Sequence, residues 1–301
     1  MSRKNYLDGK DVKEIRTGAS GAQVFVVHGE EIVKWVSRED VEIERFLTYR
    51  RETEFYKSKD TEKATYLPKV LKAEASDDEI FLVLKKYEPL KREDLNEDVL
   101  RKIAGVLAQI HSDRAPCFLR RSAEERKQIS EKEIAESVQG WKEVLAEHLG
   151  AFVGKEIDRI AARIKEIQAW HETEPRALVH GDFHWDNLLS DENGNILVCD
   201  WQNVKYDAPS GDLSFFLSRL GADGIEVDPE VFLSAYVDAM RELGSAVLEI
   251  DEIKKHMAAA IVLTSFLFWH RFLHGADAER VRGIYEKMVD DFYAVDLGGL
   301  V

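Results

Sequence analysis

One stretch of this sequence concentrates residues that can do chemistry: the run 180–187 (HGDFHWDN), with Asp200 thirteen positions beyond it. Asp182 and Asn187 stand five positions apart, the spacing at which phosphoryl-transfer sites place a base and a metal-binding amide. Asp200 follows residues 195–199 (NILVC), which we predict to be a strand after a turn at 191–194 (DENG). The pattern predicts Asp182 as a general base, and Asn187 and Asp200 as ligands of Mg²⁺.

Two other interpretations of this stretch stay open. Asp and Asn are frequent turn formers, so an isolated D-x-x-x-x-N match is more often only a turn. The His and Asp residues that alternate over 180–186 are also typical of zinc or paired-metal sites in hydrolases. This metallohydrolase alternative explains neither Asn187 nor Asp200, which favours phosphoryl transfer.

The segment 178–189 (LVHGDFHWDNLL) resembles the catalytic loop of the aminoglycoside phosphotransferase and choline kinase superfamily, which has His-Gly-Asp where protein kinases usually have His-Arg-Asp. Asp200-Trp201-Gln202 is similar to the metal-binding segment of that family, and Gly211-Asp212-Leu213 to a downstream motif. The resemblance implies that His180 and Asp212 support the loop. It is specific over 178–217, looser over 15–88 and weak beyond 220.

The resemblance implies an α+β, two-lobed protein-kinase-like fold, with a small β-rich N-lobe and a larger, mostly helical C-lobe. The residue pattern agrees, because strands at 24–27, 31–36, 68–74 and 79–84 surround one helical stretch at about 40–58. After residue 90 helical spacing dominates. We therefore expect an N-lobe over 1–88 that binds the nucleotide. A C-lobe over 89–301 would carry the catalytic loop and the acceptor-binding helices.

Lys34 is the clearest nucleotide-binding candidate in the N-lobe. It interrupts the apolar strand 31–36 (EIVKWV), and a buried ammonium group needs a partner. At an edge strand it would simply reach water. The functional interpretation is a lysine that holds the α- and β-phosphates and pairs with a helix glutamate. The family pattern Arg-Glu-x-x-Phe-Tyr matches 51–56 (RETEFY), so we prefer Glu52 to Glu54 as that partner.

Two backbone segments complete the expected nucleotide site. The segment 17–23 (TGASGAQ) lies before a strand, and small residues such as Gly18, Ser20 and Gly21 would let backbone N–H groups approach phosphates. Alone, it is more often only a turn. The resemblance also implies that adenine binds backbone atoms near Lys86 and Tyr87. Many family members have an acidic residue after this strand, whereas this chain has Lys85 and Lys86. ATP is the expected cofactor, and because of this departure GTP is possible.

The acceptor side is less constrained by the sequence. Some side chains that could stack on a substrate or attract an amine neighbour the metal residues in the sequence, and one lies in an aromatic helix. They are Trp185, Asp186, Trp201, Tyr206 and Trp269. For the aromatic segment 265–272 a place in the core is the more frequent outcome. The acceptor itself is expected to be a small hydroxyl compound, such as an aminoglycoside, a choline-like alcohol or a sugar.

Composition limits the partners of the chain. A net charge of −15 over 301 residues disfavours nucleic acid and anionic membranes, although an acidic surface also serves solubility alone. The two cysteines and the lack of an apolar N-terminal stretch indicate a reducing, cytoplasmic location with no membrane partner. Oligomeric state is not predicted.

Together these features predict an ATP- and Mg²⁺-dependent enzyme that transfers the γ-phosphoryl group to a hydroxyl of a small molecule. A nucleotide-binding pseudokinase that acts as an interaction module is the main alternative. It is disfavoured because Lys34, Asp182, Asn187 and Asp200 are all present. A protein kinase is disfavoured because no Ala-Pro-Glu segment follows Asp200.

Overall fold

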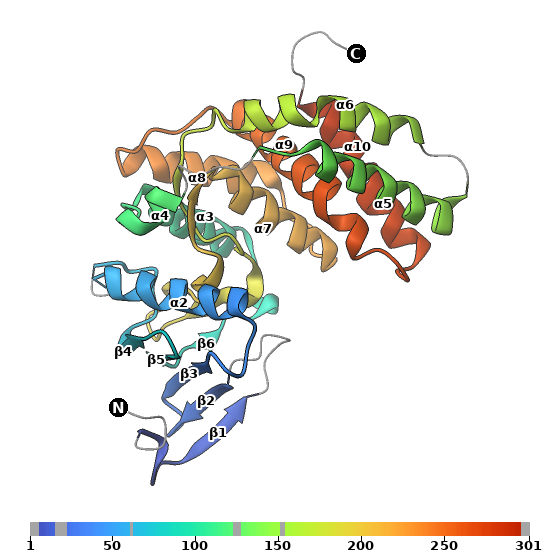
Figure 1. The fold of residues 1–301 in the computed structure, drawn as a ribbon. Helices are drawn as coiled ribbons and strands as arrows, with labels where there is room; N and C mark the ends of the chain where they lie inside the picture. Colours follow the sequence, from blue (N-terminus) through green and yellow to red (C-terminus); the bar gives the residue numbers. More distant parts are fainter. Residues whose placement is uncertain (1–5, 16–22, 61–62, 123–127, 151–153, 296–301) are drawn as a thin grey trace.

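A five-stranded antiparallel sheet forms most of the N-terminal part of the computed structural model, which describes residues 6–15, 23–60, 63–122, 128–150 and 154–295 (Figure 1). The strands lie in the order β1-β2-β3-β5-β4. Their bounds are Val12–Ile15, Gln23–Val27, Glu31–Ser37, Glu79–Lys85 and Val70–Ala75, in that order across the sheet. The expected hairpin turn between β2 and β3 is present, and His28 and Gly29 both have positive φ there (51° and 72°).

Helix α2 (Ile43–Ser58) lies between this sheet and the helical part of the chain (Figure 1). Residues 80–84 of β5 are all buried because both faces of the sheet are covered. The face of α2 that packs inward carries Phe46, Tyr49, Phe55 and the acidic Glu52. A charged group on a buried helix face requires a partner, which the site provides.

The C-terminal part is mostly helical, as expected. Its α-helices and 3₁₀ turns (η) are η1 Arg92–Asp94, α3 Glu97–Ser112, α4 Cys117–Ser122, α5 Glu131–Leu149, α6 Gly154–His171, α7 Ser210–Ala222, α8 Pro229–Glu242, α9 Ile250–Phe268, η5 Trp269–Arg271 and α10 Ala278–Ala294. Local chemistry sets several of their starts. The Asn96 side chain accepts the N–H of Val99 at the start of α3, and Pro229 occupies the first turn of α8.

Short strands and 3₁₀ turns hold the predicted catalytic segment. Strands β6 (Glu88–Pro89), β8 (Leu188–Ser190) and β9 (Ile196–Val198) form one small antiparallel sheet. A second pair joins β7 (Ala177–Val179) to β10 (Lys205–Asp207). The turns η3 (Trp185–Asn187) and η4 (Trp201–Asn203) lie between these strands. The catalytic segment is therefore fixed at both ends by backbone pairing.

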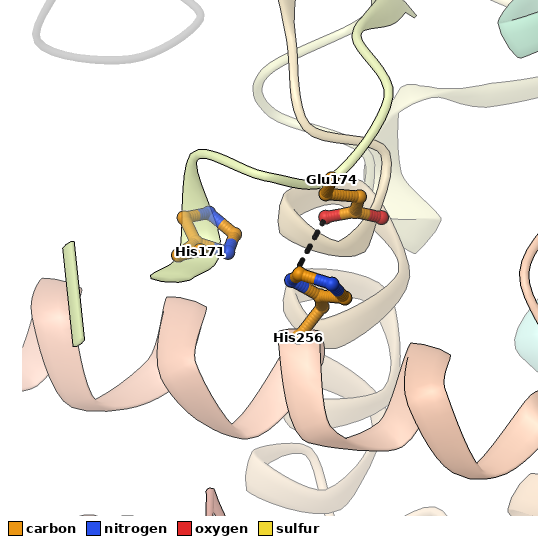
Figure 2. Close-up of side chains that lie close together, drawn as sticks. All are labelled: His171, Glu174 and His256. Atoms are coloured by element: carbon orange, nitrogen blue, oxygen red, sulfur yellow. Dashed lines mark ion pairs between the residues drawn. The ribbon is translucent and has the colours of Figure 1, made fainter. Parts of the chain in front are cut away.

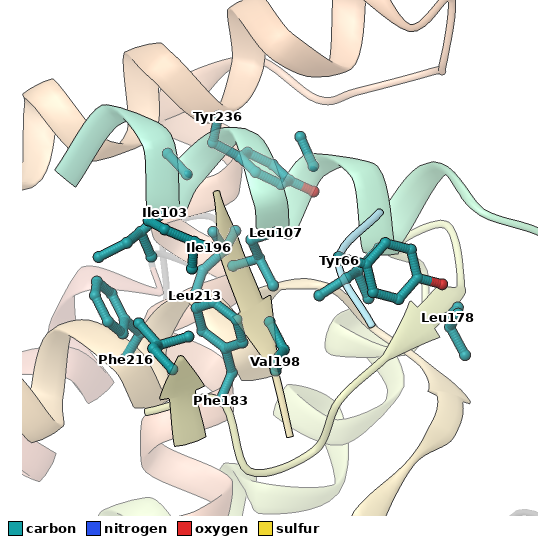
Figure 3. Close-up of a cluster of buried hydrophobic side chains, with 14 of the residues drawn as sticks. Tyr66, Ile103, Leu107, Leu178, Phe183, Ile196, Val198, Leu213, Phe216 and Tyr236 are labelled. Carbon is teal, nitrogen blue, oxygen red and sulfur yellow. The ribbon is translucent and has the colours of Figure 1, made fainter. Parts of the chain in front are cut away.

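The largest buried cluster crosses between the two parts of the chain. It joins Phe55 of α2 and Leu82 of β5 to side chains of α3, α7 and α8. Figure 3 shows part of this cluster, including Leu107 of α3, Phe216 of α7 and Tyr236 of α8. Trp201 belongs to this cluster, is fully buried and stacks on Phe55 at 4.5 Å between ring centroids. A second cluster lies between α5, α6, α9 and α10. No helix among the described residues combines the length and the apolar character needed to cross a bilayer.

Candidate active site

Asp212 is the side chain that fixes the catalytic segment. It lies in the first turn of α7, is 2% exposed and accepts two backbone N–H groups, from His180 (2.7 Å) and Gly181 (2.8 Å). His111 Nε2 lies 3.4 Å from the same carboxylate. Burial alone would raise the pKa of Asp212, but His111 and the backbone donors outweigh it and hold that pKa below its ordinary value. The expected supporting role of Asp212 agrees with this geometry.

Gly181 explains why the segment has glycine before the aspartate. Its φ is +79°, and a Cβ built on it would lie 2.3 Å from the backbone oxygen of Asn203. Both facts exclude a side chain, because L-residues rarely adopt this conformation and the carbonyl of η4 fills the space. The backbone turns sharply here and directs Asp182 away from the core.

His180 supports the turn from beneath. Its Nδ1 accepts the N–H of Asp182 (3.2 Å), so its Nε2 carries the proton and donates to the Cys199 oxygen (2.9 Å). Burial lowers the pKa of this imidazole, which favours the neutral form that both bonds need. His180 is thereby a structural link between the loop and the end of β9.

Asp182 and Asn187 occupy the positions expected of a base and a metal ligand. The Asn187 amide nitrogen donates to the Asp182 backbone oxygen (2.9 Å), which leaves the amide oxygen as the group available to a cation. The Asp182 side chain is 33% exposed, and burial raises the pKa of its carboxyl group. His184 and His180 act in the opposite direction on that pKa. A partly exposed carboxylate of raised basicity suits a proton acceptor.

Asp200 lies next to Asn187 because the Cys199 N–H donates to the Asn187 backbone oxygen (3.0 Å). Asp200 has φ 64°, a left-handed conformation that non-glycine residues rarely adopt. Its carboxylate accepts from Gln202 (2.6 Å) and pairs with Lys34 (3.0 Å). Burial would raise the pKa of Asp200, but Lys34 holds it below its ordinary value, so the carboxylate is ionised.

Lys34, Glu52 and Asp200 form one ion cluster. Lys34 Nζ lies 2.8 Å from Glu52 Oε1 and 3.0 Å from Asp200 Oδ1. The preference for Glu52 over Glu54 is confirmed, since Glu54 pairs instead with Lys57 on the outer face of α2. Burial alone would lower the pKa of Lys34, but the two carboxylates raise it above its ordinary value. Glu52 also accepts the Trp201 N–H (3.2 Å), so it fixes both the lysine and the residue after Asp200.

The remaining nucleotide-side residues are less defined. Gly18, Ser20 and Gly21 lie outside the described residues. Lys86 follows β5, and its backbone N–H donates to the Glu30 oxygen (2.7 Å), while its side chain pairs with Glu88. The backbone of Tyr87 is therefore a better candidate for an adenine contact than the N–H of Lys86.

Two aromatic residues that we expected at the acceptor, Trp185 and Trp201, lie in the core instead. Trp201 is fully buried, and Trp185 is 3% exposed and donates its indole N–H to the Leu90 oxygen (2.9 Å). Sequence proximity to Asp200 does not tell which way a ring points. Trp269 is half-buried against the second buried cluster and stays a proposal. Tyr206 is half-buried on β10 and stays a proposal.

Other residues take the exposed positions beside the loop. Asp186 faces Arg92 (3.1 Å), which also pairs with Asp223 (3.0 Å), and Arg219 lies 4.0 Å away. Phe215 is 36% exposed and its ring lies edge-on to His184. We did not foresee these contacts. The one available signal was the i, i+4 spacing of Phe215 and Arg219, which places both on one face of the helix that begins near Asp212.

The alternating His and Asp residues of 180–186 do not gather around a point that could hold a metal. Among the residues described, the one set of three His, Cys, Asp or Glu ligand atoms within 4.8 Å of each other is His171, Glu174 and His256, in another part of the molecule. This removes the geometric basis of the metallohydrolase alternative.

The model of a phosphotransferase enzyme family matches residues 11–244, which include every element of the site described above. The chain belongs to this family. The phosphotransferase is similar in fold to solved small-molecule kinases. An amicoumacin kinase in complex with AMP-PNP and Ca²⁺ has a TM-score of 0.60 at 14% identity, with 93% of this chain and 88% of that chain covered.

Two further structures support the same fold. An ethanolamine kinase of Plasmodium vivax has a TM-score of 0.59 at 14% identity, covering 97% of this chain and 84% of that one. A GDP complex of an aminoglycoside 2′-phosphotransferase has a TM-score of 0.58 at 14% identity, covering 96% and 95%. A search of curated proteins found no match. The family match makes this chain a phosphotransferase, and the shared fold has the expected two-lobed, kinase-like architecture.

Replacement of Gly181 by Ala tests the geometry of the loop. We expect Gly181→Ala to lower the free energy of unfolding by roughly 2–5 kcal/mol, because left-handed strain adds to a steric conflict. Gly194→Ala is the matched control: its φ is +75°, but nothing lies within 4 Å of the added Cβ. It should cost only about 1–2 kcal/mol. Urea denaturation measures the free energy of unfolding of both variants. Equal losses would show that the Asn203 carbonyl moves aside at little cost, and would contradict the steric argument.

A double-mutant cycle tests the Lys34–Glu52 pair. Lys34→Met and Glu52→Gln should each weaken binding of Mg-ATP, and the double variant should lose less than the sum, with a coupling of about 0.5–3 kcal/mol. Glu54→Gln is the control and should bind normally. Calorimetric titration provides the affinities. Additive losses, or a larger loss from Glu54→Gln, would refute the pairing as a functional unit.

Proposed function

We propose that this phosphotransferase moves the γ-phosphoryl group of ATP to a hydroxyl of a small molecule, with Asp182 as the base. One observation carries the proposal: Lys34 Nζ lies 3.0 Å from Asp200 Oδ1, so a phosphate-binding lysine of the N-lobe meets a metal-binding carboxylate of the C-lobe. The charge of Asp200 also contributes to the raised pKa of Asp182. The Asp182 carboxylate is therefore close enough to Asp200 to interact with it electrostatically.

The residues present fit a Mg²⁺ ion. Asp200 offers an ionised carboxylate and Asn187 an amide oxygen, which are the hard oxygen ligands that Mg²⁺ prefers while it keeps several waters. Bound there, the ion would neutralise charge that develops on the phosphates. Asp200 adopts the αL conformation, and its carboxylate accepts a hydrogen bond from Lys34.

Side chains of this protein would accept the proton of the acceptor hydroxyl and position the phosphates of the nucleotide. Asp182 would accept a hydrogen bond from the acceptor hydroxyl and take its proton as the new oxygen–phosphorus bond forms. The bond from the γ-phosphorus to the bridging oxygen breaks, ADP leaves, and Asp182 returns the proton to solvent. Lys34 would hold the α- and β-phosphates, and Glu52 keeps Lys34 in place. Gly18, Ser20 and Gly21 would cover the phosphates, and the backbone near Tyr87 would bind the base of ATP or GTP.

Asp182→Asn tests the base. The variant should bind Mg-ATP with nearly unchanged affinity and lose turnover by on the order of 10²–10⁴-fold, because a proton acceptor is removed without removing a charge-binding group for the nucleotide. Asp200→Asn is the contrasting variant and should lose Mg-ATP affinity and turnover together. Calorimetry and ADP release provide the two readouts on folded proteins.

Near-normal turnover of Asp182→Asn would remove Asp182 from the mechanism. A wild-type protein that binds Mg-ATP but transfers phosphate to no hydroxyl compound, even in a broad screen, would instead support the pseudokinase alternative.

The acceptor is proposed to be a neutral or cationic hydroxyl compound. The chain carries a net charge of −15, and its field repels anions at moderate salt. Beside the loop the two arginines Arg92 and Arg219 are offset by Asp186 and Asp223, and Asp182 adds a further negative charge. Exposed Phe215 offers a ring face to an apolar or cationic group.

A size-matched screen tests this charge preference. Amino sugars, amino alcohols and neutral sugars should be phosphorylated with kcat/KM at least about tenfold above sugar acids and sugar phosphates, which corresponds to about 1.4 kcal/mol. ADP release is the measurement. If the best acceptor is anionic, the charge argument is wrong. Arg92→Gln and Arg219→Gln would then show which arginine binds it.

A further inference from the structure

Three side chains with metal-binding atoms converge at a place that the proposed reaction does not use. His171 is the last residue of α6, Glu174 lies in the loop before β7, and His256 lies in the middle of α9 (Figure 2). Their ligand atoms all lie within 4.8 Å of one another. His171 and Glu174 are three positions apart in the sequence, whereas His256 lies 82 positions after Glu174, so the fold brings His256 to the other two.

His256 is a buried group with unused binding capacity. Its side chain is 2% exposed, and its Nδ1 has no hydrogen-bond partner. The nearest carboxylate oxygen, Glu174 Oε2, lies 4.0 Å away, which is too far for a hydrogen bond. Trp170 stacks on the imidazole with 4.0 Å between ring centroids and fixes its orientation. Burial lowers the pKa of His256 to about 4, so the ring is neutral, the form that ligates metals.

Glu174 is a buried carboxylate without a balancing cation. It is 5% exposed, and among the residues described it has no Lys or Arg ion-pair partner. Ser210 donates to it twice, from its backbone N–H (3.1 Å) and its hydroxyl group (2.5 Å). Burial raises its pKa to about 7 despite these bonds. A buried carboxylate with no cation beside it would be stabilised by a positive ion, since buried charges are usually paired or bound to metal.

We propose that His171, Glu174 and His256 form a binding site for a divalent transition-metal ion of the zinc type, separate from the nucleotide site. Two imidazoles and one carboxylate are a ligand set typical of Zn²⁺, whereas Mg²⁺ prefers oxygen ligands throughout. In a tetrahedral site with bonds of about 2.1 Å, ligand atoms are roughly 3.4 Å apart. The observed spread therefore requires the ligands to close by about 1.4 Å at most, which side-chain rotation can supply. Water would fill the fourth position.

The ion would strengthen the support of the catalytic loop. Glu174 holds Ser210, the first residue of α7, and two residues later Asp212 holds the backbone of His180 and Gly181. A metal bond to Glu174 would fix this carboxylate, in the way that hydrogen-bonded groups around a metal orient its ligands. The role is structural. It does not depend on the identity of the acceptor or on the proposed function.

Metal titration of the full chain tests the proposal. After removal of bound metal with a chelator, wild-type protein should bind one Zn²⁺ per chain in competition calorimetry, and Co²⁺ should give the intense visible absorption of a tetrahedral site. His256→Phe keeps a ring stacked on Trp170, and Glu174→Gln keeps an acceptor for Ser210. Each should weaken Zn²⁺ binding by at least about 100-fold, the upper range for losing only a supporting residue.

Two controls locate the ion. His274→Gln removes an exposed imidazole that lies beside Glu147, and it should leave Zn²⁺ affinity unchanged. Asp200→Asn should also leave it unchanged, although it disables the nucleotide site. If His256→Phe does not fold, His171→Gln replaces it, with the same loss expected.

These measurements distinguish the proposed metal site from binding at the nucleotide site and from no binding. Stoichiometric Zn²⁺ binding that is lost in the His171, Glu174 and His256 variants and kept in both controls supports the site. No binding by folded wild-type protein overturns it. Loss of binding in Asp200→Asn, with retention in His256→Phe and Glu174→Gln, also overturns it, because the ion would then belong to the nucleotide site.

Discussion

The ion cluster of Lys34, Glu52 and Asp200 is the constraint on which the site depends. It brings together a strand of the sheet, the helix α2 and the end of β9, and thereby connects the two lobes by charge. Removing Lys34 would leave the Glu52 carboxylate, which is 1% exposed, without its cation, which is costly in a low-dielectric environment. The large buried cluster joins the same elements, since Phe55 of α2 stacks on Trp201, the residue after Asp200. Packing and electrostatics therefore fix the same relative position of Lys34 and Asp200.

The catalytic loop is rigid for reasons that lie in its backbone. Gly181 and Asp200 both adopt left-handed conformations. The turn at Gly181 orients the carboxylate of the next residue, Asp182, and the turn at Asp200 orients its own carboxylate. Asp212 and His180 hold these turns through buried hydrogen bonds to backbone groups. Strained backbone of this kind persists only where surrounding contacts maintain it. Preorganised groups of this kind need little reorganisation when a substrate binds.

Structures of about 14% identity share this fold, which shows how few residues the architecture requires. On the proposed acceptor side, exposed residues of alternating charge, Asp186, Arg92, Asp223 and Arg219, lie near the ring of Phe215. Such a surface is set by side chains that make no contribution to the buried core. Acceptor preference can therefore change while the loop, its supports and the ion cluster stay fixed.

By itself, the sequence predicted the two-lobed fold and the candidate residues for the chemistry. Apolar periodicity marks β2, β3, β5 and α3, and fixed spacing marks Asp182, Asn187 and Asp200, because these features depend on neighbours along the chain. It chose Glu52 correctly only through the family pattern. Tertiary structure alone decided the rest. Ring direction put Trp185 and Trp201 in the core, and long-range packing joined Arg92 to Asp186 and His256 to Glu174. Contacts between distant segments leave no periodic signal in either segment, so only the folded chain reveals them.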